Sequence, residues 1–165
     1  MRIAVVVGNP KPTSRTLEAA LLLADKFGVA PDPVIDIAVF GNKLLDFGNQ
    51  DVAAAIASVT AADIAIIASP TYKATYTGLL KLFLDMFPPN GLDGIVALPL
   101  MLGAGPSHAL APDLLLKPVL VELGALCPFP GLYLIDKSFA EDPRLDAYAS
   151  RAGHYLPLRT REVSA

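Results

Sequence analysis

Apolar residues gather in short uninterrupted runs along the chain, and segments with helical spacing lie between these runs. Glycine, proline or small polar residues bound most of the runs, as expected for strands of a parallel sheet that is buried on both faces. One run is weaker, because Asp36 alternates with Ile35 and Ile37, and this suits an edge strand. The pattern predicts five strands, at residues 3–7, 34–39, 64–68, 95–102 and 131–135.

The segments between the runs carry apolar residues at every third or fourth position, which predicts amphipathic helices. The segment 107–123 is unusual, because leucine and valine cover most of its circumference, and we expect Pro118 to kink it. One sheet face cannot cover so wide an apolar surface, so we expect part of this helix to contact another subunit. The predicted helices begin near residues 17, 51, 79, 107 and 142 and end near 27, 60, 87, 123 and 152, with a loop at 40–49.

Strand and helix alternate five times, which predicts one α/β domain of flavodoxin-like, three-layer architecture. We expect five parallel strands in the order 2-1-3-4-5 with helices on both faces. This order reverses between strands 1 and 3, and ligands bind outside the carboxyl ends of strands at such a point. The domain is predicted to span residues 1–156, and residues 157–165 are a polar tail that can be disordered.

Composition and charge exclude several classes of protein. The 165 residues are 53% hydrophobic with a net charge of −3, which argues against general nucleic-acid binding. No apolar run approaches the roughly 18 residues of a membrane span, and the first run is too short for a signal peptide. The single cysteine, Cys127, fits a reducing cytoplasm and is expected to be a packing residue. His108 and His154 have no histidine or cysteine at ligand spacing, so no metal site is predicted.

The loop after the first predicted strand has the composition of a phosphate site. Backbone N–H groups and the positive end of a helix dipole converge where a buried strand passes into a helix. No acidic residue precedes Glu18 there, whereas Lys11 and Arg15 place two cations beside the dipole. Ser14 and Thr16, with Thr13, add hydroxyl donors. The alternative is an ordinary strand-to-helix turn in which Thr13 or Ser14 is the N-cap.

Two further loops on the same rim suit a planar ring. Pro70 and Thr71 are expected to hold extended backbone against a flat group, Tyr72 to pack on it, and Gly78 to allow close approach. The segment 103–105 presents backbone N–H groups with little side-chain bulk, as the polar edge of a flavin needs. Together with the phosphate loop, these features predict flavin mononucleotide (FMN). A dinucleotide fits less well, because the first loop lacks G-x-G-x-x-G and no acid follows the predicted second strand at the position that reads the ribose.

Three spaced motifs carry a family resemblance. Residues 8–16 read G-N-P-K-P-T-S-R-T, residues 69–81 contain S-P-T-Y-K-A and G-L-L-K, and a third stretch has L-P-L at 98–100, then Gly103, His108 and L-K-P-V-L at 116–120. The first two resemble G-S-P-R-x-x-S-R-[ST] and S/T-P-x-Y-K-A…G-x-L-K of the NADPH-dependent FMN reductase family, close to its alkanesulfonate-system members. The similarity runs from Met1 to about Ile135.

The chain departs from the family pattern at several positions. Asn9 replaces the usual serine and Lys11 the usual arginine, and both can still donate to phosphate. Ala104 replaces a glycine. Some alkanesulfonate-type reductases carry a tyrosine in a helix bulge after the aspartate equivalent to Asp113, where this chain has Leu114. Whether FMN stays bound between turnovers is therefore open.

The resemblance implies an oxidoreductase that passes hydride from NADPH or NADH to FMN and needs no general acid or base. The implied partners are a second copy of the chain, as a homodimer or homotetramer, and a flavin-dependent monooxygenase that receives the reduced flavin. A flavodoxin-like electron-transfer protein, or a quinone or azo reductase, is the alternative. The expected cofactor-binding residues are Asn9, Lys11, Ser14, Arg15, Thr16, Pro70, Thr71, Tyr72, Lys73, Gly103, Ala104, Gly105 and His108.

Overall fold

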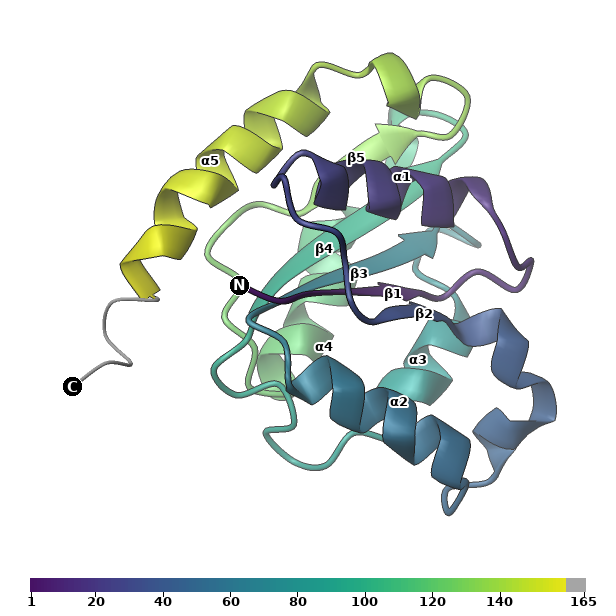
Figure 1. Cartoon of the computed structure of the whole chain (residues 1–165). Coiled ribbons are helices and arrows are strands. Elements are labelled where there is room, and N and C mark those ends of the chain that lie inside the picture. The colour runs from purple at the N-terminus through teal and green to yellow at the C-terminus, as the bar shows by residue number, and fades with distance from the viewer. Residues whose placement is uncertain (160–165) are drawn as a thin grey trace.

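A five-stranded parallel sheet in the order β2-β1-β3-β4-β5 forms the centre of the computed structural model, which describes residues 1–159 (Figure 1). The predicted flavodoxin-like order is confirmed. Every residue of β1 is buried, because neighbours pair on both sides of this strand and helices cover both faces. The strands are β1 (Ile3–Val7), β2 (Val34–Asp36), β3 (Ile64–Pro70), β4 (Val96–Gly103) and β5 (Leu132–Ile135).

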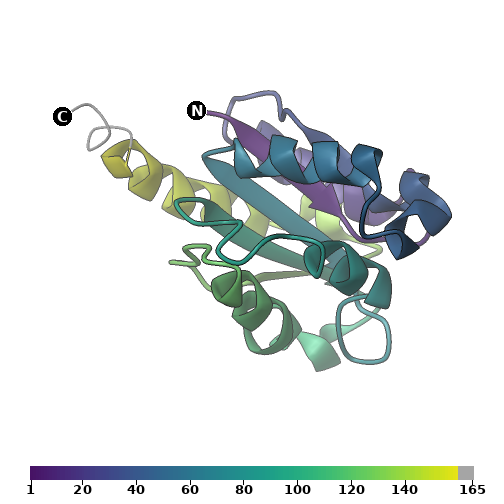
Figure 2. The ribbon, with the colours of Figure 1, turned by 90° about the horizontal axis from the view of Figure 1, so that it is seen from below.

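Helices cover the two faces of the sheet in separate groups (Figures 1 and 2). The side chains of Val5 and Leu23 belong to the core on the side of α1 and α5, whereas Val6 and Phe83 belong to the core on the side of α2, α3 and α4. The sandwich therefore has three layers, as the alternation of strands and helices predicts. The α-helices are α1 (Arg15–Asp25), α2 (Gln50–Thr60), α3 (Gly78–Leu84), α4 (Lys117–Glu122) and α5 (Arg144–Arg159).

The second strand is shorter than the sequence pattern predicts. It ends at Asp36, and residues Ile37–Leu45 form the 3-10 segment η1, in place of the last strand residues and most of the loop predicted at 40–49. Ile37 is fully buried while Val39 is 70% exposed, so the chain leaves the sheet to bury Ile37 under α2 and α3. The left-handed φ of 53° at Gly41 breaks the segment into two turns.

The long helix predicted at 107–123 is three short pieces. They are the 3-10 turn η2 (Pro106–His108), the π-helical turn η3 (Pro112–Leu116) and α4. In η3 the Lys117 N–H bonds the Pro112 carbonyl five residues earlier, so the interruption lies just before the predicted kink at Pro118. Proline at 118 has no N–H to continue the regular ladder, which explains why the break falls there.

The chain end differs from the prediction as well. The last helix is capped as expected, since the Asp142 carboxylate accepts the N–H of Arg144, but it continues past residue 152 to Arg159. The predicted polar tail falls largely outside the described residues. Within residues 1–159 no helix is long and apolar enough to cross a bilayer.

Gly8, directly after β1, is a position where the packing requires glycine. A Cβ there would lie 2.3 Å from the Leu80 Cβ, so Gly8→Ala should lower the free energy of unfolding by about 2–3 kcal/mol. Gly78→Ala is the matched control, because a Cβ at Gly78 meets nothing within 4 Å, and we expect it to change stability by less than about 0.5 kcal/mol. Urea unfolding compares the two, and equal midpoints would contradict this packing constraint.

Candidate functional site

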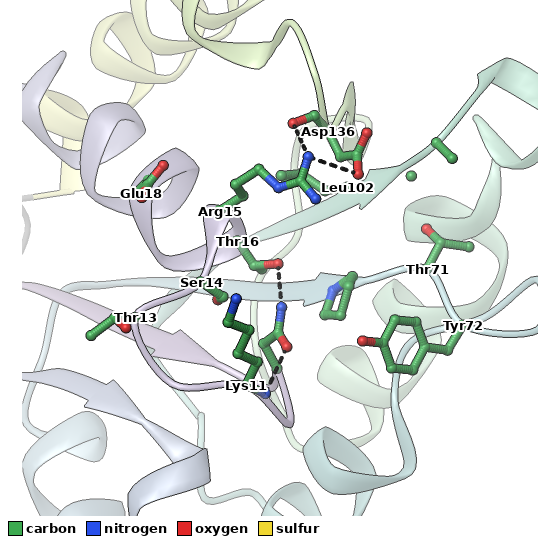
Figure 3. A pocket seen from close by; sticks show the side chains of 14 residues that line it. Lys11, Thr13, Ser14, Arg15, Thr16, Glu18, Thr71, Tyr72, Leu102 and Asp136 are labelled. Atoms are coloured by element: carbon green, nitrogen blue, oxygen red, sulfur yellow. Dashed lines mark hydrogen bonds and ion pairs between the residues drawn. The ribbon is translucent and has the colours of Figure 1, made fainter.

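A cleft of about 460 Å³ opens at the carboxyl ends of β1, β3 and β4, beside the end of β5 (Figure 3). Three loops far apart in the sequence form its walls, as the switch point in the strand order predicts. Most of the predicted cofactor-binding residues meet there; Lys73, Gly105 and His108 do not. The cleft is lined by Asn9, Lys11, Thr13, Ser14, Arg15, Thr16, Glu18, Pro70, Thr71, Tyr72, Leu102, Gly103, Ala104 and Asp136.

The first wall is the loop between β1 and α1. Ser14 is the N-cap of α1, and its Oγ accepts the Leu17 N–H at 3.3 Å. Asn9 is buried and braces the loop, since its Nδ2 donates to Thr16 Oγ1 at 3.0 Å and its Oδ1 accepts the Lys11 N–H at 2.9 Å. The ordinary capping role of Ser14 is thus present, and Asn9 fixes the loop through protein contacts of its own.

Charged side chains of both signs line the cleft at this helix start. Glu18 is the acidic residue of the first turn of α1, while Lys11 and Arg15 approach the positive end of the helix dipole. Arg15 contacts Asp136, a residue that we did not predict, through Nη1 at 3.3 Å from Oδ2 and 3.4 Å from the backbone carbonyl. Lys11 makes no ion pair with any residue that the structure describes.

The Asp36 carboxylate, at the end of β2, holds the loop between β1 and α1. Because β2 ends earlier than predicted, Asp36 is its last residue. Asp36 Oδ2 accepts the Thr13 N–H at 3.1 Å, and Thr13 has a left-handed φ of 50°. This hydrogen bond holds a strained residue in place, so the observed contact of Asp36 is with the loop backbone.

The second wall is the segment after β3. Ser69 Oγ accepts the Thr77 N–H at 3.0 Å, and the Thr77 hydroxyl donates to the Gly8 carbonyl, which ties this segment to the first loop. Tyr72 is 51% exposed on the wall of the cleft, and its side chain extends toward the loop that carries Lys11 (Figure 3). Thr71 Oγ1 is buried and has no hydrogen-bond partner, so its donor and acceptor capacity is available to a bound group.

A strained turn follows Tyr72. Its backbone N–H bonds the Thr75 carbonyl at 2.8 Å and the reverse bond is 3.2 Å, and Lys73 and Ala74 between them have φ of 51° and 70°. Both central residues are left-handed, as in a type I′ hairpin turn that normally uses Asn-Gly. Lys73 is exposed and does not line the cleft, although the sequence analysis places it among the cofactor-binding residues.

The third wall shows why Gly103 is glycine. A Cβ at Gly103 would lie 1.8 Å from the Tyr133 hydroxyl, which donates to the Gly105 carbonyl at 2.8 Å. Packing against Tyr133 therefore requires this glycine, while Gly103 and Ala104 still border the cleft. Gly105 does not line the cleft, and His108 lies in a separate groove of about 470 Å³ with Leu114.

The titratable groups away from the cleft do not suggest reactivity. Burial raises the pKa of the Cys127 thiol to about 11, so this cysteine stays protonated near neutral pH and is a poor nucleophile. Burial also raises the pKa of the Tyr148 hydroxyl. No cluster of three or more metal-ligating side chains exists among residues 1–159 whose side chains are described.

The residues of the cleft fit FMN by their chemistry. The loop before α1 offers cations and hydroxyls to a phosphate, Tyr72 offers an aromatic wall, and the unpartnered Thr71 hydroxyl offers a hydrogen bond. Asp136 escaped the sequence analysis, although one signal could have found it: it is the first residue after β5, at the same edge of the sheet.

The fold and the cleft define a flavodoxin-like nucleotide-binding protein, and comparison with known proteins identifies the family. The profile of the NADPH-dependent FMN reductase family matches residues 1–140, so the chain belongs to this family. FMN reductase (NADPH) of Escherichia coli strain K12 is 33% identical over 171 residues, covering 98% of this chain and 84% of that protein.

Further proteins of similar sequence or structure include FMN reductases and oxidoreductases. NADH-dependent FMN reductase SfnF of Pseudomonas putida is 28% identical, over 84% of this chain and 80% of its own. The apo structure of an NADH:FMN oxidoreductase, EMOB, superposes with a TM-score of 0.82 at 30% identity, covering 95% of this chain and 88% of that one. An oxidoreductase from Corynebacterium diphtheriae also gives a TM-score of 0.82, at 21% identity, and supports the fold.

The strained turn generates a stability prediction. Ala74→Gly relieves a left-handed alanine, and we expect the free energy of unfolding to rise by about 0.5–1 kcal/mol after the entropy cost of glycine is subtracted. Ala54→Gly, on the exposed face of α2, is the control and should lower it by about 1 kcal/mol. Thermal unfolding measures both, and a loss of stability in Ala74→Gly would show that the turn is not strained.

Proposed function

We propose that the protein is an NAD(P)H-dependent FMN reductase whose flavin lies in the cleft between β1, β3 and β4. The observation that carries this proposal is the pairing of a cationic helix start with an aromatic wall in one cleft, in a chain of the FMN reductase family. Lys11, Arg15, Ser14 and Thr16 would hold the phosphate. NADPH or NADH would be the reductant, as in the names of its relatives.

The same cleft would hold the flavin ring. Tyr72 would pack against the ring or its edge, and Thr71 would donate or accept one hydrogen bond. Backbone N–H groups of Gly103 and Ala104 would meet negative charge that develops at the polar edge of the ring. Bound FMN supplies the redox chemistry, namely acceptance of hydride from the reduced nicotinamide. The residues of this chain position the rings, and none acts as a general acid or base.

The test of this function is a reduction assay. Purified protein is titrated with FMN and then mixed anaerobically with NADPH or NADH while flavin absorbance is followed. We expect FMN to bind and to bleach with a reduced nicotinamide. Absence of binding and of bleaching would contradict the proposal, and bleaching by a redox protein alone would indicate an electron-transfer protein. Faster turnover with quinones or azo dyes than with free FMN would indicate a reductase of those acceptors.

Arg15→Ala tests the phosphate end of the site in the same titration. Loss of a charged hydrogen bond should weaken FMN binding by about 1.5–3 kcal/mol. Riboflavin, which lacks the phosphate, should lose little affinity. The matched control is Arg151→Ala, an exposed arginine on α5 outside the cleft, and it should bind FMN as the wild type does. Unchanged FMN affinity in Arg15→Ala would contradict the assignment of the phosphate site.

We infer a homo-oligomer from the surface around η3 and α4. Leu110 and Leu114 are each 65% exposed and Val121 is 53% exposed, so an apolar band remains that the sheet does not cover. Pairing of two copies along this band would bury it. We also propose that the protein releases reduced flavin to a flavin-dependent monooxygenase in the cytoplasm.

Light scattering after size-exclusion chromatography tests the oligomer. We expect a dimer or tetramer for the wild type and a monomer for Leu114→Asp, because a carboxylate cannot be buried unpaired at an interface. Leu45→Asp is the control, since Leu45 is 74% exposed on η1 and lies outside the band. A wild-type monomer, or an equally dissociated control, would contradict the assignment of this surface.

A further inference from the structure

The Arg15 guanidinium is engaged by a carboxylate of its own chain. Arg15 begins α1 and Asp136 follows β5, and the Arg15 Nη1 lies 3.3 Å from Asp136 Oδ2 and 3.4 Å from its carbonyl (Figure 3). Both residues line the same cleft. Asp136, like Glu18, therefore places a carboxylate in a cleft whose cations and hydroxyls suit a phosphate.

Asp136 depends on this contact. Its Oδ1 is buried and has no hydrogen-bond partner, and its side chain is only 25% exposed. A carboxylate oxygen that has lost water without gaining a donor is costly, and a nearby cation offsets part of that cost. The positive charge of Arg15 therefore offsets part of the cost of burying the Asp136 carboxylate, as long as no other anion binds the guanidinium.

The contact is loose enough to be broken. Well-formed hydrogen bonds between a guanidinium and a carboxylate are about 2.7–2.9 Å long, and both contacts of Arg15 are longer. The Arg15 side chain is 56% exposed, and exposed pairs of this kind contribute little. Lys11 on the same loop has no acidic partner among the described residues, so the corner combines one available and one engaged cation.

A phosphate that enters this corner meets the engaged cation in one of two ways. It shares Arg15 with Asp136, so that two anions lie near one guanidinium and repel each other. Otherwise it displaces Asp136, whose second oxygen then loses its partner as well. Either arrangement makes binding of the phosphate less favourable than Lys11 and Arg15 alone would make it.

We propose that Asp136 competes with the flavin phosphate for Arg15 and thereby keeps FMN exchangeable. This inference rests on the proposed function, since it assigns the phosphate of FMN to this corner. The internal carboxylate lowers affinity and replaces the phosphate at Arg15 when flavin leaves. Asp136 acts through Arg15 and is a positioning residue.

Asp136→Asn tests the competition, because the amide keeps the shape and removes the charge. We expect FMN to bind about tenfold tighter, by fluorescence titration, and to dissociate correspondingly more slowly in stopped flow, while riboflavin affinity stays within twofold. Asp146→Asn, which removes the partner of Lys26 at the C-terminal end of α1, makes the same change in net charge and should leave FMN affinity unchanged. Unchanged or weaker FMN binding in Asp136→Asn would overturn the proposal.

Two further measurements test whether Asp136 acts through Arg15 and whether the competition holds independently of FMN binding. In an Arg15→Ala background, Asp136→Asn should improve FMN binding by no more than twofold, whereas an equal tenfold gain would show that Asp136 does not act through Arg15. Inorganic phosphate should raise the melting temperature of Asp136→Asn more than that of the wild type. That comparison holds even if the wild type does not bind FMN, and equal shifts would contradict the competition.

Discussion

The geometry of the cleft depends on how the loops after β1 and β3 are locked together where they leave the sheet. The Gly8 N–H bonds the Ala68 carbonyl at 2.9 Å, and the Gly8 carbonyl accepts the Thr77 hydroxyl. The same hydroxyl accepts the Leu80 N–H at 3.1 Å, so it is also the N-cap of α3. One buried threonine thereby fixes the start of the loop that precedes α1 against the helix that follows the aromatic wall.

The hydrogen bond between Thr77 and Gly8, together with the strand order, determines which loops face the cleft. Parallel neighbours β1 and β3 bring their carboxyl ends to one edge, and the contact of Gly8 with Leu80 leaves no room for other residues at that point. The first loop must then turn over the sheet edge with its helix start facing the cleft, while Tyr72 faces it from the other side (Figure 3). The anion corner and the aromatic wall are separate loops held by a shared backbone contact.

The sequence predicted the fold well where burial alone decides the structure. The four fully apolar runs became strands with ends shifted by at most two residues, because a strand covered on both faces must be apolar throughout. The prediction failed where a tertiary contact or a proline decides the local structure. Ile37 leaves the edge strand to enter the core, and the leucine-rich segment breaks into η2, η3 and α4 because its prolines cannot continue a regular helix.

The sequence predicted the parts of the candidate site that depend on local loop composition, but not the long-range contacts within it. Lys11, Arg15 and Tyr72 stood out because cations, hydroxyls and an aromatic residue directly after strands are unusual without a ligand. The pairing of Arg15 with Asp136 joins residues 121 positions apart, and the hydrogen bond of Thr13 to Asp36 depends on where β2 ends, so neither could be read from local pattern. Gly103 lies at the cleft, as the sequence analysis expected, but it must be glycine because a side chain there would collide with Tyr133.

The central claim is that the loop between β1 and α1 binds the phosphate of FMN. A crystal structure of the FMN complex tests it most directly. The account predicts phosphate oxygens within hydrogen-bonding distance of the Lys11 ammonium, the Arg15 guanidinium and the Thr16 hydroxyl, with the flavin ring extending toward Tyr72. A phosphate bound elsewhere, or a ring seated in the groove beside His108 with the first loop empty of phosphate, would contradict it.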